Sequence, residues 1–132
     1  MSVVFHPLFF LCSNSFDIRK KFSVRNFTPD CLQYQCNAMQ YIGELCRYLV
    51  NAPPCEDDHK LQLKYAIGNG MRPDIWVAFQ KRYNVKNIVE FYGATEGNVG
   101  CFNNIGKVGA IGYMPLFLQK FKSIKYVPFH FL

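Results

Sequence analysis

The sequence has no apolar run of about 18 or more residues, the length that a helix needs to cross a bilayer. None of its six cysteines forms a Cys-x-x-Cys pair, and its three histidines lie far apart in the chain, so zinc-site spacing is absent. No serine has the flanking glycines of a nucleophile elbow. These absences argue against a membrane-spanning chain, a zinc protein and a serine hydrolase.

Charged residues are also few, at 18% of the sequence, while half of the residues are apolar. This composition is typical of a globular domain, and 132 residues suffice for one. The net charge of +6 first suggests nucleic acid or anionic lipid. However, residues 22–112 hold nine basic and eight acidic residues, so the excess lies in the flanks. We therefore expect no nucleic-acid partner.

The first half of the central region predicts a helix, a strand and a second helix. A helix is expected within residues 26–36, opened by Thr28-Pro29-Asp30, because proline is tolerated in the first turn. Residues 38–42 read as a short buried strand. Residues 43–50 have apolar side chains at helical spacing, which predicts a helix with one buried face. The residues of that face are Leu45, Tyr48 and Leu49.

The second half of the central region predicts a βαβ unit. Residues 61–67 read as a strand and residues 87–91 as another. Between them, Pro73 opens a helix whose apolar residues recur at helical spacing. Its expected core residues are Ile75, Trp76, Phe79 and Tyr83. Strands joined by a helix run parallel, so we predict an α/β fold with a sheet of about three parallel strands.

Two loops are candidates for ligand binding. Gly68-Asn69-Gly70 follows the first strand of the unit, and residues 92–97 follow the second. Open α/β sheets bind ligands beyond the carboxyl ends of their strands, and parallel strands bring both loops to that edge. Glycines allow a ligand to approach the backbone closely, but taken alone the first loop is better explained as a tight turn without a ligand.

The second loop carries the richer chemistry. Tyr92 offers a flat face for a base, and Gly93 and Ala94 leave space beside it. Thr95 can donate a hydrogen bond to an anionic oxygen, and Glu96 is a carboxylate suited to Mg²⁺. This set fits a nucleotide and its metal, and a polar turn without a ligand is the alternative.

A dinucleotide-binding domain is a rival interpretation. Gly68 and Gly70 match the first two glycines of the Gly-x-Gly-x-x-Gly pattern, and Glu90 lies where a ribose-binding acid is expected. The third glycine position holds Pro73, which does not give the close packing of helix on strand that glycine gives. The pattern therefore favours this small Rossmann-like alternative only weakly.

Four segments together resemble the fatty acid transport protein/very long-chain acyl-CoA synthetase family, which is adenylate-forming. They are Met39-Gln-Tyr-Ile-Gly-Glu-Leu-Cys-Arg-Tyr-Leu-Val50, Ile67-Gly-Asn-Gly-Met-Arg-Pro73, Glu90-Phe-Tyr-Gly-Ala-Thr-Glu-Gly97 and Lys107-Val-Gly-Ala-Ile-Gly112. The resemblance covers residues 19–113, which would be a partial AMP-binding domain. Residues 1–18 and 114–132 look divergent, and we expect irregular structure there.

The resemblance implies a role for each candidate residue. Such enzymes join a fatty acid to ATP as an acyl-adenylate and then pass the acyl group to CoA. Gly68, Asn69, Gly70, Tyr92, Gly93 and Ala94 would bind the nucleotide, with Tyr92 stacked on adenine. Thr95 and Glu96 would act in catalysis, Glu96 as a ligand of Mg²⁺. Tyr41 and Gly43 would border the fatty-acid channel.

The resemblance also implies what is missing. The phosphate loop with its lysine, the ribose-binding aspartate, the hinge and the C-terminal domain of this family have no counterpart here. We therefore expect weak or absent binding of fatty acid and ATP, and no ligase activity from the chain alone. A non-catalytic module that binds itself, a full-length relative or a membrane is the alternative. The resemblance implies membrane association, at the endoplasmic reticulum, peroxisome or plasma membrane, without a transmembrane segment.

Overall fold

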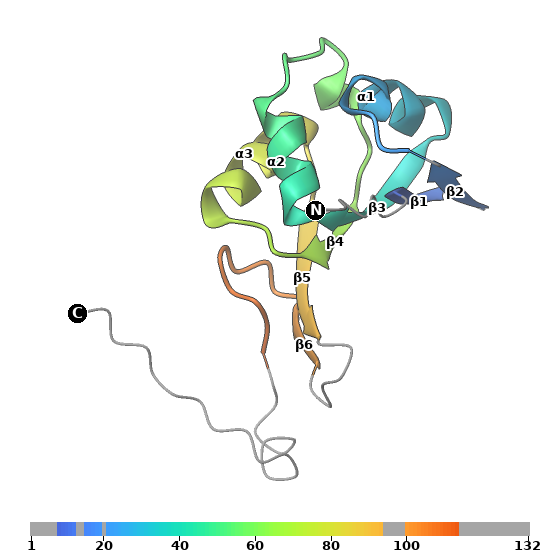
Figure 1. Ribbon diagram of the computed structural model, residues 1–132. Coiled ribbons are helices and arrows are strands. Elements are labelled where there is room, and N and C mark those ends of the chain that lie inside the picture. The colour runs from blue at the N-terminus through green and yellow to red at the C-terminus, as the bar shows by residue number, and fades with distance from the viewer. Residues whose placement is uncertain (1–7, 13–14, 20, 94–99, 114–132) are drawn as a thin grey trace, which may run out of the picture.

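The computed structural model describes residues 8–12, 15–19, 21–93 and 100–113, which form one sheet with helices packed on it. The sheet has the strand order β2-β1-β3-β4-β5-β6. Its centre is parallel, and β1, β2 and β6 are antiparallel to their neighbours. Figure 1 shows the helices gathered around one end of the sheet, with β6 and the segment after it at the other end.

The predicted βαβ unit is confirmed. Strand β4 (Tyr65–Asn69) leads through helix α3 (Pro73–Tyr83) to strand β5 (Asn87–Gly93), and β4 and β5 are direct parallel neighbours. Helix α3 begins at the predicted proline. It buries the four predicted residues, Ile75, Trp76, Phe79 and Tyr83. Asn84 ends the helix in the left-handed conformation that asparagine tolerates.

Strand β3 (Cys36–Ile42) and helix α2 (Gly43–Asn51) confirm the other predicted strand and helix. The buried face of α2 is a partial correction, because Cys46 and Leu49 are fully buried whereas Tyr48 is 47% exposed. A cysteine behaves as a small apolar residue, so the pattern of large side chains alone placed Tyr48 instead of Cys46 on the buried face.

The helices cover only one face of the central sheet. Along β4 the burial alternates, with Ala66 and Gly68 buried beneath the helices and Tyr65 and Ile67 exposed on the other face. Parallel strands are normally covered on both faces, but no described element forms a second layer over the exposed side chains of this face.

The N-terminal segment differs from the prediction of irregular structure over residues 1–18. Strands β1 (Leu8–Cys12) and β2 (Ser15–Arg19) form an antiparallel hairpin, and β1 pairs with β3. The unpaired backbone groups of β3 are the physical reason, since an edge strand binds any extended segment that lies within reach. The predicted divergent tail, residues 114–132, lies outside the described residues.

Two element boundaries also differ from prediction. Helix α1 (Val24–Gln33) begins before Thr28, so Pro29 lies inside the helix instead of in its first turn. Strand β4 begins at Tyr65, after a 3-10 turn η1 (Asp58–Lys60) and an extended lead-in that buries Leu61 and Leu63. An extended segment with alternating burial has the same sequence pattern as a strand, whether or not it pairs.

The guanidinium group of Arg82 on α3 bonds to the end of α2, to the segment after it and to Asp58. It donates hydrogen bonds to the carbonyl oxygens of Leu49, Val50, Ala52 and Pro53, at 2.7–3.0 Å, which satisfies the C-terminal end of α2. It also donates to the buried carboxylate of Asp58 at 2.8 Å. The planar fork of arginine makes this many bonds possible from one side chain.

Asp58 extends this network to helix α1. Its carboxylate accepts hydrogen bonds from the Thr28 hydroxyl at 2.5 Å and from the Cys55 N–H at 3.0 Å. Burial alone would raise the pKa of Asp58, but the hydrogen bonds from Thr28, Cys55 and Arg82 outweigh it and lower the pKa below its ordinary value. The carboxylate is therefore charged at neutral pH and fully paired.

Arg82→Lys tests this network without removing its charge. A lysine has a single ammonium group and cannot replace all the hydrogen bonds to the partly buried carbonyl oxygens and to buried Asp58, so we expect the free energy of unfolding to fall by roughly 2 kcal/mol or more. Chemical denaturation followed by circular dichroism measures it. Arg47→Lys is the matched control, since Arg47 makes an exposed pair with Glu44 on α2 and its loss should change little. Equal effects from the two variants would contradict the role given to Arg82.

Candidate functional site

The two candidate loops follow the carboxyl ends of neighbouring strands. Gly68 of β4 pairs with Glu90 of β5 in parallel register. Two residues further along each strand, Gly70 and Tyr92 therefore lie at the same edge of the sheet. Strand β3 ends at this edge too, because its Ile42 pairs with Asn69. The ends of three strands thus meet where ligands bind in open α/β sheets.

Both loops are shorter than predicted, because the strands before them extend further. Gly68 and Asn69 are the last residues of β4, and only Gly70 of that motif lies beyond the strand. Tyr92 and Gly93 belong to β5, where they pair with Cys101 and Gly100 of β6 (Gly100–Asn103). The antiparallel partner β6 explains the extension, because it supplies ladder hydrogen bonds that the sequence pattern of β5 alone does not reveal.

A buried carboxylate joins the three strand ends. Glu90 is 4% exposed, and one of its oxygens accepts a hydrogen bond from the N–H of Met71 at 3.0 Å. Its other oxygen accepts a hydrogen bond from the hydroxyl of Tyr41 on β3. Burial, and then the bond to Glu90, raise the pKa of Tyr41 well above its ordinary value, so the phenol stays a neutral donor. Glu90 therefore fixes β3 and the turn after β4 to β5.

Two of the candidate glycines serve this packing. A Cβ atom on Gly43 would lie 1.9 Å from the carbonyl oxygen of Gly70, and a Cβ atom on Gly68 would lie 2.1 Å from the carbonyl oxygen of Tyr41. Backbone atoms occupy both positions, so a side chain cannot be accommodated by the turn of a flexible neighbour. Gly43 and Gly68 thus allow β3 and β4 to approach closely.

The other two candidate glycines face open space. A Cβ atom on Gly70 or Gly93 would meet no heavy atom of the described residues within 4 Å. Gly70 has a φ of 74°, the left-handed region that favours glycine. The ring of Tyr92 is 53% exposed beside them. This combination of open backbone and an exposed aromatic face fits the predicted binding of a nucleotide base, and Asn69 is an exposed polar side chain at the same edge.

The predicted channel residues lie next to this edge but inside the fold. Tyr41 is 1% exposed with its hydroxyl bonded to Glu90, and Gly43 is buried against the Gly70 peptide. Both positions serve packing among the described residues, and their role in a fatty-acid channel stays a prediction. Ala94, Thr95 and Glu96 lie outside the described residues, so their predicted roles are untested.

The rival dinucleotide interpretation does not agree with the state of Glu90. A ribose-binding acid must present its carboxylate to the ligand. Both oxygens of Glu90 instead accept hydrogen bonds inside the fold, from Tyr41 and from the Met71 N–H. Glu90 is therefore a structural residue. The sequence signal for this structural role is that Glu90 lies two residues after Ile88 and so shares its face of the strand. That face is buried, and a carboxylate on a buried face must have internal partners.

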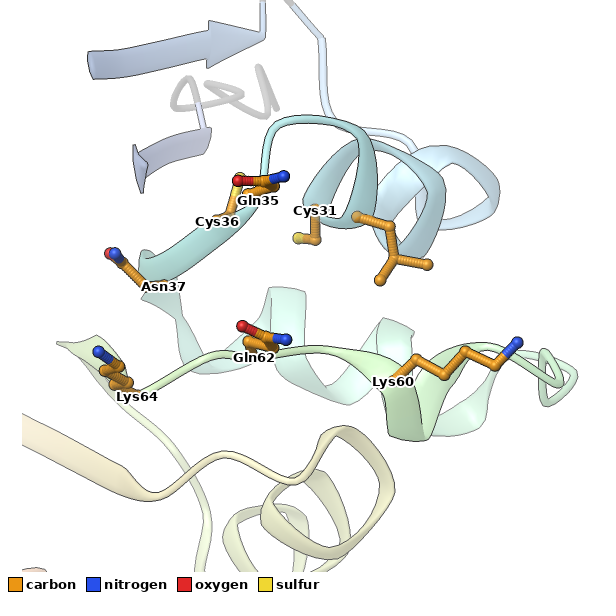
Figure 2. A pocket seen from close by; sticks show the side chains of 8 residues that line it. Cys31, Gln35, Cys36, Asn37, Lys60, Gln62 and Lys64 are labelled. Atoms are coloured by element: carbon orange, nitrogen blue, oxygen red, sulfur yellow. The ribbon is translucent and has the colours of Figure 1, made fainter. Parts of the chain in front are cut away.

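Two hollows lie away from the carboxyl edge. One, of about 300 Å³, is formed where the start of β3 and the end of α1 face the segment that leads into β4. Figure 2 shows Cys36 and Asn37 across from Gln62 and Lys64 in this hollow. The other lies between the three helices. Neither includes a predicted site residue.

Two further kinds of feature are absent from residues 8–12, 15–19, 21–93 and 100–113. Within these ranges no group of three or more histidine, cysteine or acidic side chains is placed to hold a metal ion. None of the helices there has the length and apolarity that crossing a membrane requires.

Comparison with known proteins finds close relatives. The chain is 46% identical over 110 residues to human long-chain fatty acid transport protein 1, a match that covers 83% of this chain and 17% of the relative. It is 50% identical over 97 residues to mouse long-chain fatty acid transport protein 3, and this match covers 72% of this chain and 14% of the relative. Rat long-chain fatty acid transport protein 2 is 44% identical to it over 115 residues, and this match covers 85% of this chain and 18% of the relative.

The match covers only a small part of each relative. The chain spans less than a fifth of the length of these curated relatives. The longest matches include more residues of this chain than the range 19–113, so the similarity is not confined to that range. No family model matches the chain.

Gly43→Ala tests the close packing at the carboxyl edge. Although alanine favours a helix over glycine, the new Cβ atom would overlap the Gly70 carbonyl. We expect a fall in the free energy of unfolding of about 1–3 kcal/mol, measured by denaturant titration. Gly100→Ala is the control, because its Cβ atom would meet neighbours only at 3.7 Å and 3.9 Å, which is ordinary contact. Unchanged stability of Gly43→Ala would show that the edge is looser than described.

Proposed function

Because this chain belongs to the family of long-chain fatty acid transport proteins, we propose that its carboxyl edge is part of a site for fatty acid activation. The reaction is that of an acyl-CoA synthetase, in which a fatty acid and ATP form an acyl-adenylate and CoA then accepts the acyl group. The observation that supports this proposal is the arrangement of Gly70, Gly93 and the exposed ring of Tyr92 at the ends of adjacent parallel strands.

In this proposal the described residues bind and orient the nucleotide. Tyr92 stacks on adenine, and the open backbone at Gly70 and Gly93 gives the base and the acyl-adenylate room to approach. Such stacking requires a ring that is exposed yet fixed, and the pairing of Tyr92 with Cys101 fixes its backbone. Thr95 would donate to the phosphate or the reacting carboxylate, and Glu96 would hold Mg²⁺, which neutralises the phosphate charge.

We propose that the chain does not complete this reaction alone. The sequence has no glycine- and serine-rich loop with a lysine, so the triphosphate lacks a backbone cradle. Binding through one aromatic ring and one carboxylate holds the adenylate end of the ligand more firmly than the pyrophosphate end. By the same family resemblance, we propose that the chain acts at a membrane surface.

A stable analogue of the acyl-adenylate, dodecanoyl-sulfamoyl adenosine, tests the site by titration calorimetry with the purified chain. We expect saturable binding that Tyr92→Ala weakens by about fivefold or more, because a stacked base contributes at least about 1 kcal/mol. Tyr65→Ala is the matched control, since Tyr65 is similarly exposed (47%) but starts β4 at the opposite edge. Absence of saturable binding, or equal weakening by both variants, would refute the proposed site.

The same preparation, made in a host that lacks the family, tests the activity. We expect no exchange of pyrophosphate into ATP with long-chain fatty acids. Clear exchange that depends on fatty acid would contradict the proposed inactivity while leaving the nucleotide site intact.

A second function, that of an interaction module, is supported by an apolar strip after β5. We define the apolar strip as the exposed large apolar side chains of residues 102–113, which are 44–78% exposed. Its members are Phe102, Ile105, Val108, Ile111 and Tyr113. Exposed apolar side chains that cluster on an ordered surface mark contact sites for other proteins.

The backbone beneath the apolar strip is ordered by Asn103, which is 2% exposed. Its amide donates to the carbonyl oxygens of Lys107 at 2.6 Å and Ala110 at 2.8 Å, and its side-chain oxygen accepts from the Lys107 N–H at 3.2 Å. Tyr113 then returns to donate its N–H to the carbonyl of Phe102. We propose that this loop contacts a second copy of the chain or a full-length relative.

Ile111→Asp tests the interaction module. A charge in the centre of an apolar contact disfavours association, so we expect a loss of concentration-dependent self-association in analytical ultracentrifugation and of co-purification with a full-length relative. Val77→Asp is the control, because Val77 is 56% exposed on α3, compared with 57% for Ile111. A chain that is monomeric at all concentrations and that binds no relative would refute this function.

A further inference from the structure

The hollow at the amino ends of β3 and β4 has the size and lining of a site for a small polar molecule. Its volume is about 300 Å³, at the lower end of the range of ligand pockets in proteins, and most of its surface is polar. Beside it, the N–H of Lys64 donates to the carbonyl oxygen of Asn37 at 2.7 Å, which joins its two walls. The hollow therefore lies where the chain segments before the two strands diverge.

The extended segment that leads into β4 forms one wall. Leu61 and Leu63 are 3% and 1% exposed and anchor this segment in the core. Because side chains alternate along an extended chain, Lys60, Gln62 and Lys64 face the opposite way and line the hollow. Figure 2 shows the two lysines on either side of Gln62. This wall thus places a central amide between two ammonium groups.

The turn from α1 into β3 forms the other wall, with Gln35 and Asn37. Gln35 has a φ of 51°, in the left-handed region where glycine or asparagine usually ends a helix. Figure 2 shows its amide across from that of Gln62. Among the described residues, no hydrogen bond uses the side-chain amides of these three residues. Each amide has donors and an acceptor, so all three can bond to a ligand.

The lining carries a positive charge that it does not neutralise itself. Lys60 and Lys64 are the charged groups of the lining that the structure describes, and none of the described lining residues is acidic. Asp57, outside the lining, pairs with Lys60 at 2.6 Å, but an ammonium group has three N–H donors and keeps others for a ligand. In the described part of the chain no carboxylate forms an ion pair with Lys64.

We infer that this hollow binds a small polar dianion, a metabolite with two negative charges and hydroxyl groups beside them. Its acidic oxygens accept charge-assisted hydrogen bonds from Lys60 and Lys64, and its hydroxyl groups bond to the amides of Gln35 and Gln62. A cation is disfavoured by the two lysines. An alkyl chain is disfavoured because it would cover polar side chains without giving them partners.

This site is separate from the carboxyl edge and does not depend on the proposed function. Pairing of β3 with β4 starts at Ala38 and Tyr65, directly after the hollow, whereas Gly70 lies beyond the other end of β4. The two sites share no lining residue, so each can be tested, and can fail, without the other.

Two pairs of probes test the inference by titration of the purified, nitrogen-15-labelled full chain at constant ionic strength, followed by nuclear magnetic resonance. Malate is compared with its neutral diamide, malamide, and α-glycerophosphate with glycerol. We expect saturable binding of at least one dianion and much weaker binding of both neutral probes. The tighter dianion identifies whether the hollow prefers carboxylate or phosphate. Its binding should shift the side-chain amide signals of Gln35 and Gln62 and leave that of Gln80, on α3, unchanged.

Lys64→Gln should weaken this binding by about fivefold or more, because one charge-assisted hydrogen bond is lost. The variant should fold, since the side chain is exposed and the backbone bonds of Lys64 are unaffected. Lys60→Gln is a second variant with the same expected direction. Lys86→Gln is the matched control, because it removes the same charge from an exposed position near the start of β5, outside the lining.

Three results would overturn the inference. The first is the absence of saturable binding by either dianion, and the second is equal binding of a dianion and its neutral counterpart. The third is equal weakening by Lys64→Gln and Lys86→Gln, which would indicate attraction to the net charge of the chain alone.

Discussion

One buried carboxylate, Glu90, determines how the strand ends of the central sheet meet. Its two oxygens accept hydrogen bonds from the Tyr41 hydroxyl and the Met71 N–H, so β5 is joined at once to β3 and to the turn that follows β4. A polar group buried in this way is stable only while both partners remain in place, since a buried group without hydrogen-bond partners is costly. The geometry of the carboxyl edge is therefore cooperative: Gly70 and the start of α3 hold their positions as long as Tyr41 and Glu90 remain bonded.

Arg82 has the corresponding role at the other end of the helical layer. It satisfies the last carbonyls of α2 and neutralises Asp58, which in turn holds α1 through Thr28. The apolar core lies between these two polar networks and includes fully buried Leu49, Phe79 and Ile88. Polar networks of this kind are directional, whereas apolar packing is not, so they fix the relative positions of elements that the core alone would hold more loosely. The helices can thus frame a hollow of defined shape at one end and support open strand ends at the other.

The sequence was sufficient for the βαβ unit because its signals are local. Pro73 and the spacing of Trp76 and Phe79 define α3 whatever surrounds it, and the strands on either side follow from short apolar runs. Pairing was not predictable, because a strand such as β6 or β1 is stabilised by a partner that is distant in the sequence. The candidate site shows the same division. The order of strands and loops indicated the residues of the carboxyl edge, and the family resemblance assigned them roles. Only the structure separates Gly68, which backbone atoms enclose, from Gly70, which faces open space. Glycine gives the same sequence signal in both settings.

Three of the contacts that shape the carboxyl edge are made within a short stretch of the chain. Tyr41 with Glu90, Met71 with Glu90, and Gly43 with the Gly70 peptide all lie inside the β3 to β5 segment. The match to human long-chain fatty acid transport protein 1 spans 110 residues, so it is long enough to include this segment of the chain. The exposed side chains of β4 and most of those of the apolar strip after β5 face solvent instead, and within the strip Phe102 contacts the ring of Phe91. The strand ends are therefore fixed by contacts among the described residues, whereas the exposed face of β4 and the apolar strip are the surfaces that remain open to contact with other molecules.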